Sequence, residues 1–71
     1  MNMLCEYDRV RTKVEKEGFP AGTTGVVVSL YGEGAAYEVE LWDEHNYPVD
    51  VVMFLEDELT VVPKQEYVDK G

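Results

Sequence analysis

Two runs of valine, leucine and tyrosine, separated by a glycine-rich turn, make up residues 24–42, TGVVVSLYGEGAAYEVELW. Short runs of β-branched and aromatic residues bounded by glycine are typical of strands. Gly32 and Gly34 can adopt the positive φ of a tight turn. In the second run, Tyr37, Val39 and Leu41 alternate with Glu38, Glu40 and Trp42, so the run predicts a strand with one buried face. Its expected inward set is Tyr37, Val39 and Leu41, and its outward set is Glu38, Glu40 and Trp42.

The rest of the chain shows the same short apolar runs between turn residues, and no stretch keeps helical spacing over three turns. Residues 15–24 contain two glycines and a proline, which predicts a long loop. Phe19 within this loop is expected to fold back as a lid on the core. Residues 55–58 indicate one helical turn before the last strand. We expect the remaining strands at residues 7–14, 49–54 and 59–62.

These elements predict an all-β fold, a small five-stranded SH3-like barrel with one short helical turn before the last strand. With 71 residues, the chain is long enough for one small domain. We place the barrel at residues 5–63 and a C-terminal tail at residues 64–71. A chain of this length buries roughly 60% of the surface that its unfolded form exposes, so we expect no deep active-site cleft.

Four segments of the chain read DRV at residues 8–10, FPAGTTGVVV at 19–28, AYEVEL at 36–41 and LTVV at 59–62. Together they resemble a family of short, uncharacterised bacterial proteins with an SH3-like (KOW-like) small barrel. The resemblance covers about residues 7–62 and implies the barrel fold, but no settled biochemical activity. More distantly, residues 22–27 are similar to the glycine turn of ribosome- and RNA-associated KOW modules. Those modules place lysine or arginine near that turn, where this chain has Thr23 and Thr24.

The chain is strongly acidic. Six lysines and arginines stand against fifteen aspartates and glutamates, which gives a formal net charge of −9. Binding to nucleic acid requires lysine and arginine to displace the counterions of the phosphates, so we expect no nucleic-acid partner. A basic protein is the partner that this charge favours.

The cellular setting is predicted from cysteine usage and hydropathy. The single Cys5 cannot form an internal disulfide, which favours a reducing cytoplasmic setting. The first residues lack the basic and apolar regions of a signal peptide. The longest apolar run, residues 51–55, is far shorter than a membrane span of about 20 residues. We therefore expect a cytoplasmic protein with no membrane partner.

The residues that most often carry chemistry are isolated in this sequence. His45 lies beside Asp43 and Glu44 in a polar turn, which indicates an exposed turn histidine, since a zinc site needs three or four converging protein ligands. Cys5 is followed by Glu6, whose charge disfavours a reactive thiolate. The sequence offers no combination of nucleophile, general base and oxyanion donor that would form a catalytic site. We therefore expect no enzyme activity, no catalytic residue, no metal site and no cofactor.

The segment 49–54 is apolar on both faces, although only one face can point into so small a core. If the turn at residues 43–48 pairs Trp42 with Val49, then Glu40 opposes Val51 and Glu38 opposes Met53. We call the resulting outward surface the Trp42 face. It consists of Trp42, Val49, Val51 and Met53, bordered by Glu38 and Glu40. A tryptophan with aliphatic neighbours and an acidic border has the composition of a protein-binding hot spot.

Three functions fit these observations. The first is a non-enzymatic protein-binding barrel, an immunity protein or antitoxin that neutralises a basic, nuclease-like toxin. The second is a self-associating structural or adaptor module, in which a second copy forms a homodimer, or the tail residues Tyr67 and Val68 cover the same face. The third is a ribosome-associated KOW-like accessory module. The expected partner-binding residues for the first are Glu38, Glu40, Trp42, Glu44, Val51, Met53 and Glu56.

Overall fold

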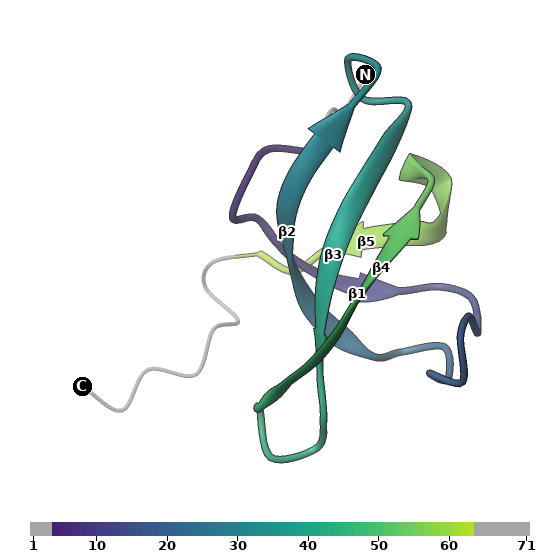
Figure 1. Cartoon of the computed structure of the whole chain (residues 1–71), viewed down its shortest axis with the longest axis vertical. Helices are drawn as coiled ribbons and strands as arrows, with labels where there is room; N and C mark the ends of the chain where they lie inside the picture. The colour runs from purple at the N-terminus through teal and green to yellow at the C-terminus, as the bar shows by residue number, and fades with distance from the viewer. Residues whose placement is uncertain (1–3, 64–71) are drawn as a thin grey trace.

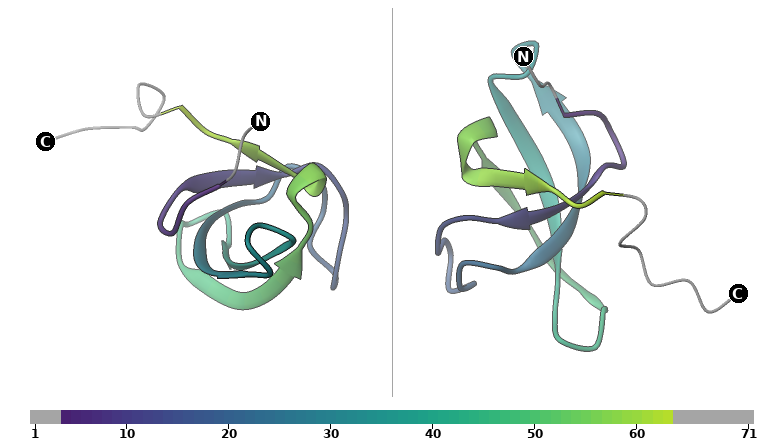
Figure 2. Two further views of the ribbon diagram at one scale, coloured as in Figure 1. Left: turned by 90° about the horizontal axis from the view of Figure 1, so that it is seen from above. Right: turned by 180° about the vertical axis from the view of Figure 1, so that it is seen from behind.

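The computed structural model describes residues 4–63, which form one five-stranded antiparallel sheet (Figure 1). The strand order across the sheet is β4-β3-β2-β1-β5. The all-β prediction is confirmed, and Figure 2 shows the strands curling around a common centre. No pairing joins β4 to β5 among the described residues, so the sheet is bent without being closed. The elements are β1 Arg9–Thr12, β2 Thr24–Tyr31, β3 Ala36–Trp42, β4 Pro48–Phe54, the 3-10 helix η1 Glu56–Glu58 and β5 Leu59–Val61.

The first strand is shorter than the predicted residues 7–14, because the chain turns just before it. Tyr7 has a φ of 73°, and the Asp8 N–H donates to the Cys5 carbonyl at 3.0 Å. The Asp8 carboxylate closes the same turn by accepting the Cys5 N–H at 2.9 Å. The other boundaries differ by one residue, since β4 starts at Pro48 and β5 ends at Val61. The predicted tail, residues 64–71 with Tyr67 and Val68, lies outside the described residues.

The core lies on the concave side of the sheet. The predicted inward set of β3 is confirmed, because Tyr37, Val39 and Leu41 are completely buried. Phe19 packs against this core from the long loop, which confirms its predicted role as a lid. Leu4 is an unexpected member, since it lies one residue before the predicted domain boundary and donates its N–H to the Tyr37 hydroxyl at 3.2 Å. The core cluster is Leu4, Val10, Val27, Tyr37, Val39, Leu41, Val52, Phe54 and Leu59.

The register between β3 and β4 matches the sequence prediction over most of its length. Glu38 pairs with Met53, and Glu40 pairs with Val51. The predicted pairing of Trp42 with Val49 is wrong, because the register shifts after Leu41 and Trp42 pairs with Pro48. The side chain of Asp43 closes the turn that follows this shift. Its Oδ1 accepts the backbone N–H groups of His45 at 2.8 Å and Tyr47 at 3.0 Å.

Gly25 lies where β2 is bonded on both sides, opposite Val10 of β1 and Leu41 of β3. A methyl group at this position would overlap the backbone carbonyl oxygen of Glu40 and would come within 2.9 Å of Val39 Cγ1. The neighbouring strand therefore occupies the space that any side chain would need. Glycine at this position is what allows β2 and β3 to approach so closely at the bend of the sheet.

We predict that Gly25→Ala lowers the free energy of unfolding by about 2 kcal/mol or more, because the β3 backbone must move to admit the methyl group. Urea unfolding followed by circular dichroism measures this difference. Thr24→Ala, one residue away and half-buried, is the control and costs less than about 1 kcal/mol. A Gly25→Ala protein as stable as the wild type would contradict the close approach of the two strands.

Candidate functional site

The Trp42 face is present on the convex side of β3 and β4. Val49, Val51 and Met53 are 55%, 48% and 47% exposed, whereas the alternate residues Val52 and Phe54 are buried in the core. These three side chains follow one another along an edge strand of the sheet. They form an apolar strip of which about half remains exposed in the described part of the chain. Exposed apolar strips of this kind mark interaction sites more often than scattered single residues do.

Trp42 is held in place by contacts on two sides. Its Nε1 donates to Glu40 Oε1 at 3.2 Å, and the Arg9 guanidinium carbon lies 5.1 Å from the centroid of the indole ring. Arg9 reaches this position because the strand registers align it with Val26, Glu40 and Val51 in one row across the sheet. The half-buried indole is therefore fixed in orientation before any partner binds, which lowers the entropic cost of binding.

Glu38 borders the other end of the apolar strip. It lies between Ser29 of β2 and Met53 of β4. A hydrogen bond to the Glu38 carboxylate, together with its negative charge, raises the pKa of the Tyr31 hydroxyl above its ordinary value. Tyr31 thus acts as a neutral hydrogen-bond donor to Glu38 at physiological pH.

The structure brings together five of the seven residues predicted to bind a partner, Glu38, Glu40, Trp42, Val51 and Met53. Glu44 lies in the β3–β4 turn beside Trp42, with its side chain 86% exposed. Glu56 lies on η1, beyond the opposite end of β4. The contact of Arg9 with Trp42 was not predicted, since it depends on the registers of three strands.

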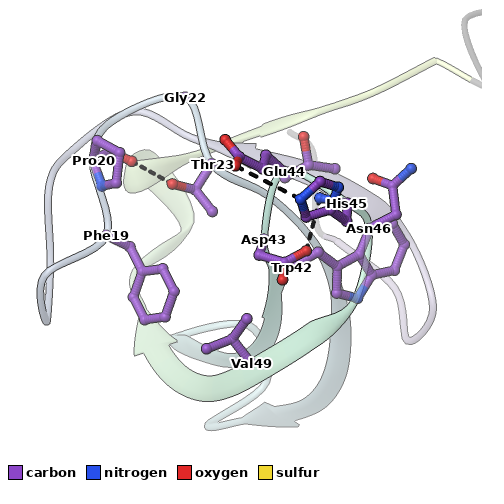
Figure 3. Close-up of a pocket in the computed structure, with 11 residues that line it drawn as sticks. Phe19, Pro20, Gly22, Thr23, Trp42, Asp43, Glu44, His45, Asn46 and Val49 are labelled. Carbon is purple, nitrogen blue, oxygen red and sulfur yellow. Dashed lines mark hydrogen bonds and ion pairs between the residues drawn. The ribbon is translucent and has the colours of Figure 1, made fainter.

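An open hollow of about 590 Å³ lies between the long loop and the β3–β4 turn. We call it the turn hollow. In the view of Figure 3, Phe19 and Trp42 lie on opposite sides of it, with Val49 between them. Thr23 and the turn residues Asp43 and Glu44 complete its wall. His45 is exposed in the same turn as predicted, with Nε2 3.8 Å from Glu44 Oε2.

A second hollow, of about 530 Å³, runs along the free edge of β4. The backbone at this edge is partly capped by side chains. Lys16 Nζ donates to the Met53 carbonyl at 3.1 Å and to Glu58 Oε1 at 2.8 Å. Asp50 Oδ1 accepts the Val51 N–H at 2.8 Å. Such capping is how edge strands are protected against pairing with another strand.

Two other kinds of site are absent from the described residues. Residues 4–63 contain no group of three or more histidine, cysteine, aspartate or glutamate residues placed to hold a metal ion. They also contain no helix with the length and apolar character needed to cross a membrane. Cys5 is exposed as a free thiol. Comparison of the chain with protein-family models, with curated proteins and with solved structures found no match.

The ion pair between Lys16 and Glu58 predicts a measurable pH dependence of stability. The hydrogen bond from Lys16, followed by that from the Leu55 N–H, holds the pKa of Glu58 below its ordinary value. A lowered folded-state pKa stabilises the fold at neutral pH, and this stabilisation is lost as pH falls through the folded-state value. We predict that Glu58→Gln costs about 1 kcal/mol at pH 7 and that the difference from wild type shrinks below about pH 4.

Urea unfolding of both proteins across this pH range measures the effect. Glu33→Gln serves as the matched control, because Glu33 is exposed in the β2–β3 turn and loses the same charge. A Glu58→Gln deficit that stays constant down to the lowest pH would contradict an ionised, hydrogen-bonded Glu58.

Proposed function

We propose that this chain is a non-enzymatic, acidic protein-binding domain that uses the Trp42 face to bind a basic protein. The observation that carries this proposal is the exposed strip of Val49, Val51 and Met53 beside a fixed tryptophan. The flanking carboxylates of Glu38 and Glu40 add the charge that a basic surface complements. A hot spot combines such an apolar anchor with a polar border.

The same proposal includes an SH3-like barrel as the fold. Its support is the long loop between β1 and β2, the tight turns on either side of β3, and η1 directly before β5. The curl of the strands in Figure 2 is in keeping with a small barrel. On this scaffold the Trp42 face lies on the convex surface, away from the core.

The net charge of −9 is the reason for proposing a basic partner. An acidic surface speeds encounter with a basic one and holds the two in register. A nuclease-like toxin is such a partner, because a cleft that binds nucleic acid is lined with cations. In this form of the proposal the chain is a cytoplasmic immunity protein or antitoxin that occupies that cleft.

Self-association through the same strand is the alternative, and two observations disfavour it. Lys16 and Asp50 occupy the Met53 carbonyl and the Val51 N–H, which a second β4 strand would have to pair with. Two copies would also bring together surfaces that each carry an excess of negative charge. A basic partner that binds the outward side chains needs no free backbone groups on β4, and its charge attracts the acidic chain.

The test compares two substitutions that each add one positive charge at a valine of similar exposure. Val51 on β4 is 48% exposed, and Val61 on β5, at the opposite edge of the sheet, is 42% exposed. Tagged wild type, Val51→Lys and Val61→Lys are used to capture proteins from an extract of the native host. We predict that the wild type and Val61→Lys retain one stoichiometric basic protein that high salt releases, whereas Val51→Lys does not.

Two outcomes would contradict the proposal. One is equal retention by the Val51→Lys and Val61→Lys variants, which would place the binding surface elsewhere. The other is a wild-type chain without a partner that sediments as a dimer, with Val51→Lys sedimenting as a monomer. That result would assign the Trp42 face to self-association.

Trp42 is predicted to be the central anchor. Trp42→Ala is expected to weaken binding of the captured partner by about 2 kcal/mol, or about 30-fold in Kd, because it removes the buried centre of the contact. Isothermal titration calorimetry measures the difference, and Val61→Ala is the control with unchanged affinity. Thermal unfolding of both variants shows that they remain folded. A Trp42→Ala variant that binds as tightly as wild type would refute the anchor assignment.

A further inference from the structure

The turn hollow adjoins the Trp42 face, since Trp42 and Val49 belong to both. Its walls combine two aromatic rings, Phe19 and Trp42, with the carboxylates of Asp43 and Glu44 (Figure 3). No lysine or arginine is among the 11 residues that line it. Aromatic faces next to carboxylates are the surroundings that favour a planar cation.

We propose that the turn hollow receives an arginine side chain of the basic partner. This inference rests on the proposed function and names one contact by which the chain would recognise its partner. A guanidinium group stacks on aromatic rings and pairs with carboxylate oxygens, whereas a lysine ammonium is a compact, strongly hydrated charge. The chain already shows the first of these contacts internally, since the Arg9 guanidinium lies 5.1 Å from the Trp42 ring centroid.

The carboxylate of Asp43 is held ready for such a contact. Its two hydrogen bonds, from the N–H groups of His45 and Tyr47, both use Oδ1. Within the described residues Oδ2 makes no further hydrogen bond and remains available to a ligand. The bond from Tyr47, with that from His45, holds the pKa of Asp43 below its ordinary value, so the group is ionised at neutral pH. Glu44 adds a second carboxylate at the rim, largely in solvent.

The opposite wall of the hollow is tied to the rest of the fold. Phe19 and Lys16 exchange backbone hydrogen bonds of 2.9 and 3.0 Å, and Phe19 packs against the core. The Thr23 hydroxyl donates to the Pro20 carbonyl at 2.6 Å, and the Thr23 N–H donates to the buried Thr12 hydroxyl at 3.1 Å. These bonds fix the loop, so little ordering is required when a side chain enters.

Trp42 is the only tryptophan of the chain, so its fluorescence reports on the hollow directly. The probes are the blocked tripeptide acetyl-Gly-Arg-Gly-amide and its citrulline and lysine counterparts. Citrulline has nearly the shape of arginine without its charge. We predict a saturable change with the arginine peptide, binding of the lysine peptide about threefold weaker, and no saturable change with the citrulline peptide.

Two variants test whether the arginine peptide binds in the turn hollow. Glu44→Gln should weaken the arginine peptide about threefold, because it removes one exposed carboxylate from the rim. Glu33→Gln is the matched control, since Glu33 lies in the β2–β3 turn, at the opposite end of the hairpin in Figure 1, and should leave the affinity unchanged. Equal losses in both variants, equal binding of the citrulline peptide, or no response of Trp42 would each overturn the inference.

The same variants separate this inference from the proposed function. If the captured basic protein binds Glu44→Gln and wild type equally while Val51→Lys abolishes binding, the arginine pocket is wrong and the proposed function stands. If the arginine peptide binds as predicted but no basic protein is retained by the wild-type chain, the pocket stands and the proposed function fails.

Discussion

At Gly25 the backbones of β2 and β3 approach so closely that no side chain fits between them. The space next to Gly25 is filled by the Glu40 carbonyl and the Val39 side chain. Because β2 is bonded to β1 and to β3 at this point, the close approach fixes three neighbouring strands of the sheet relative to one another. The next row across the sheet, Arg9 to Val51, is positioned by the same register.

The two faces of β4 differ in their surroundings. Val52 and Phe54 complete the core, whereas Val49, Val51 and Met53 remain about half exposed. An apolar surface that contributes nothing to the core is unfavourable in water unless something binds it. Its neighbours are carboxylates and an oriented tryptophan, and its backbone edge is capped by Lys16. These features together favour recognition through side chains by a partner of opposite charge.

The sequence predicted the features that depend on strict alternation within a strand. The faces of β3 and the pairing of Glu38 and Glu40 with Met53 and Val51 follow from that period. The pairing of Trp42 was missed because the register shifts between Leu41 and Trp42, an irregularity that breaks the period of two.

Features that join distant segments could not be read from local patterns. The short first strand depends on the turn at Tyr7, and the core position of Leu4 depends on a bond to the Tyr37 hydroxyl. The contact of Arg9 with Trp42 and the turn hollow require three strands and a loop to be placed together.

We propose that the Trp42 face is the surface that contacts a basic protein. The most direct measurement is chemical-shift mapping of the isotopically labelled chain with its captured partner. We expect perturbations centred on the Trp42 indole N–H and on the backbone amides of β3 and β4. Perturbations confined to β1 and β5, with the Trp42 indole unchanged, would contradict it.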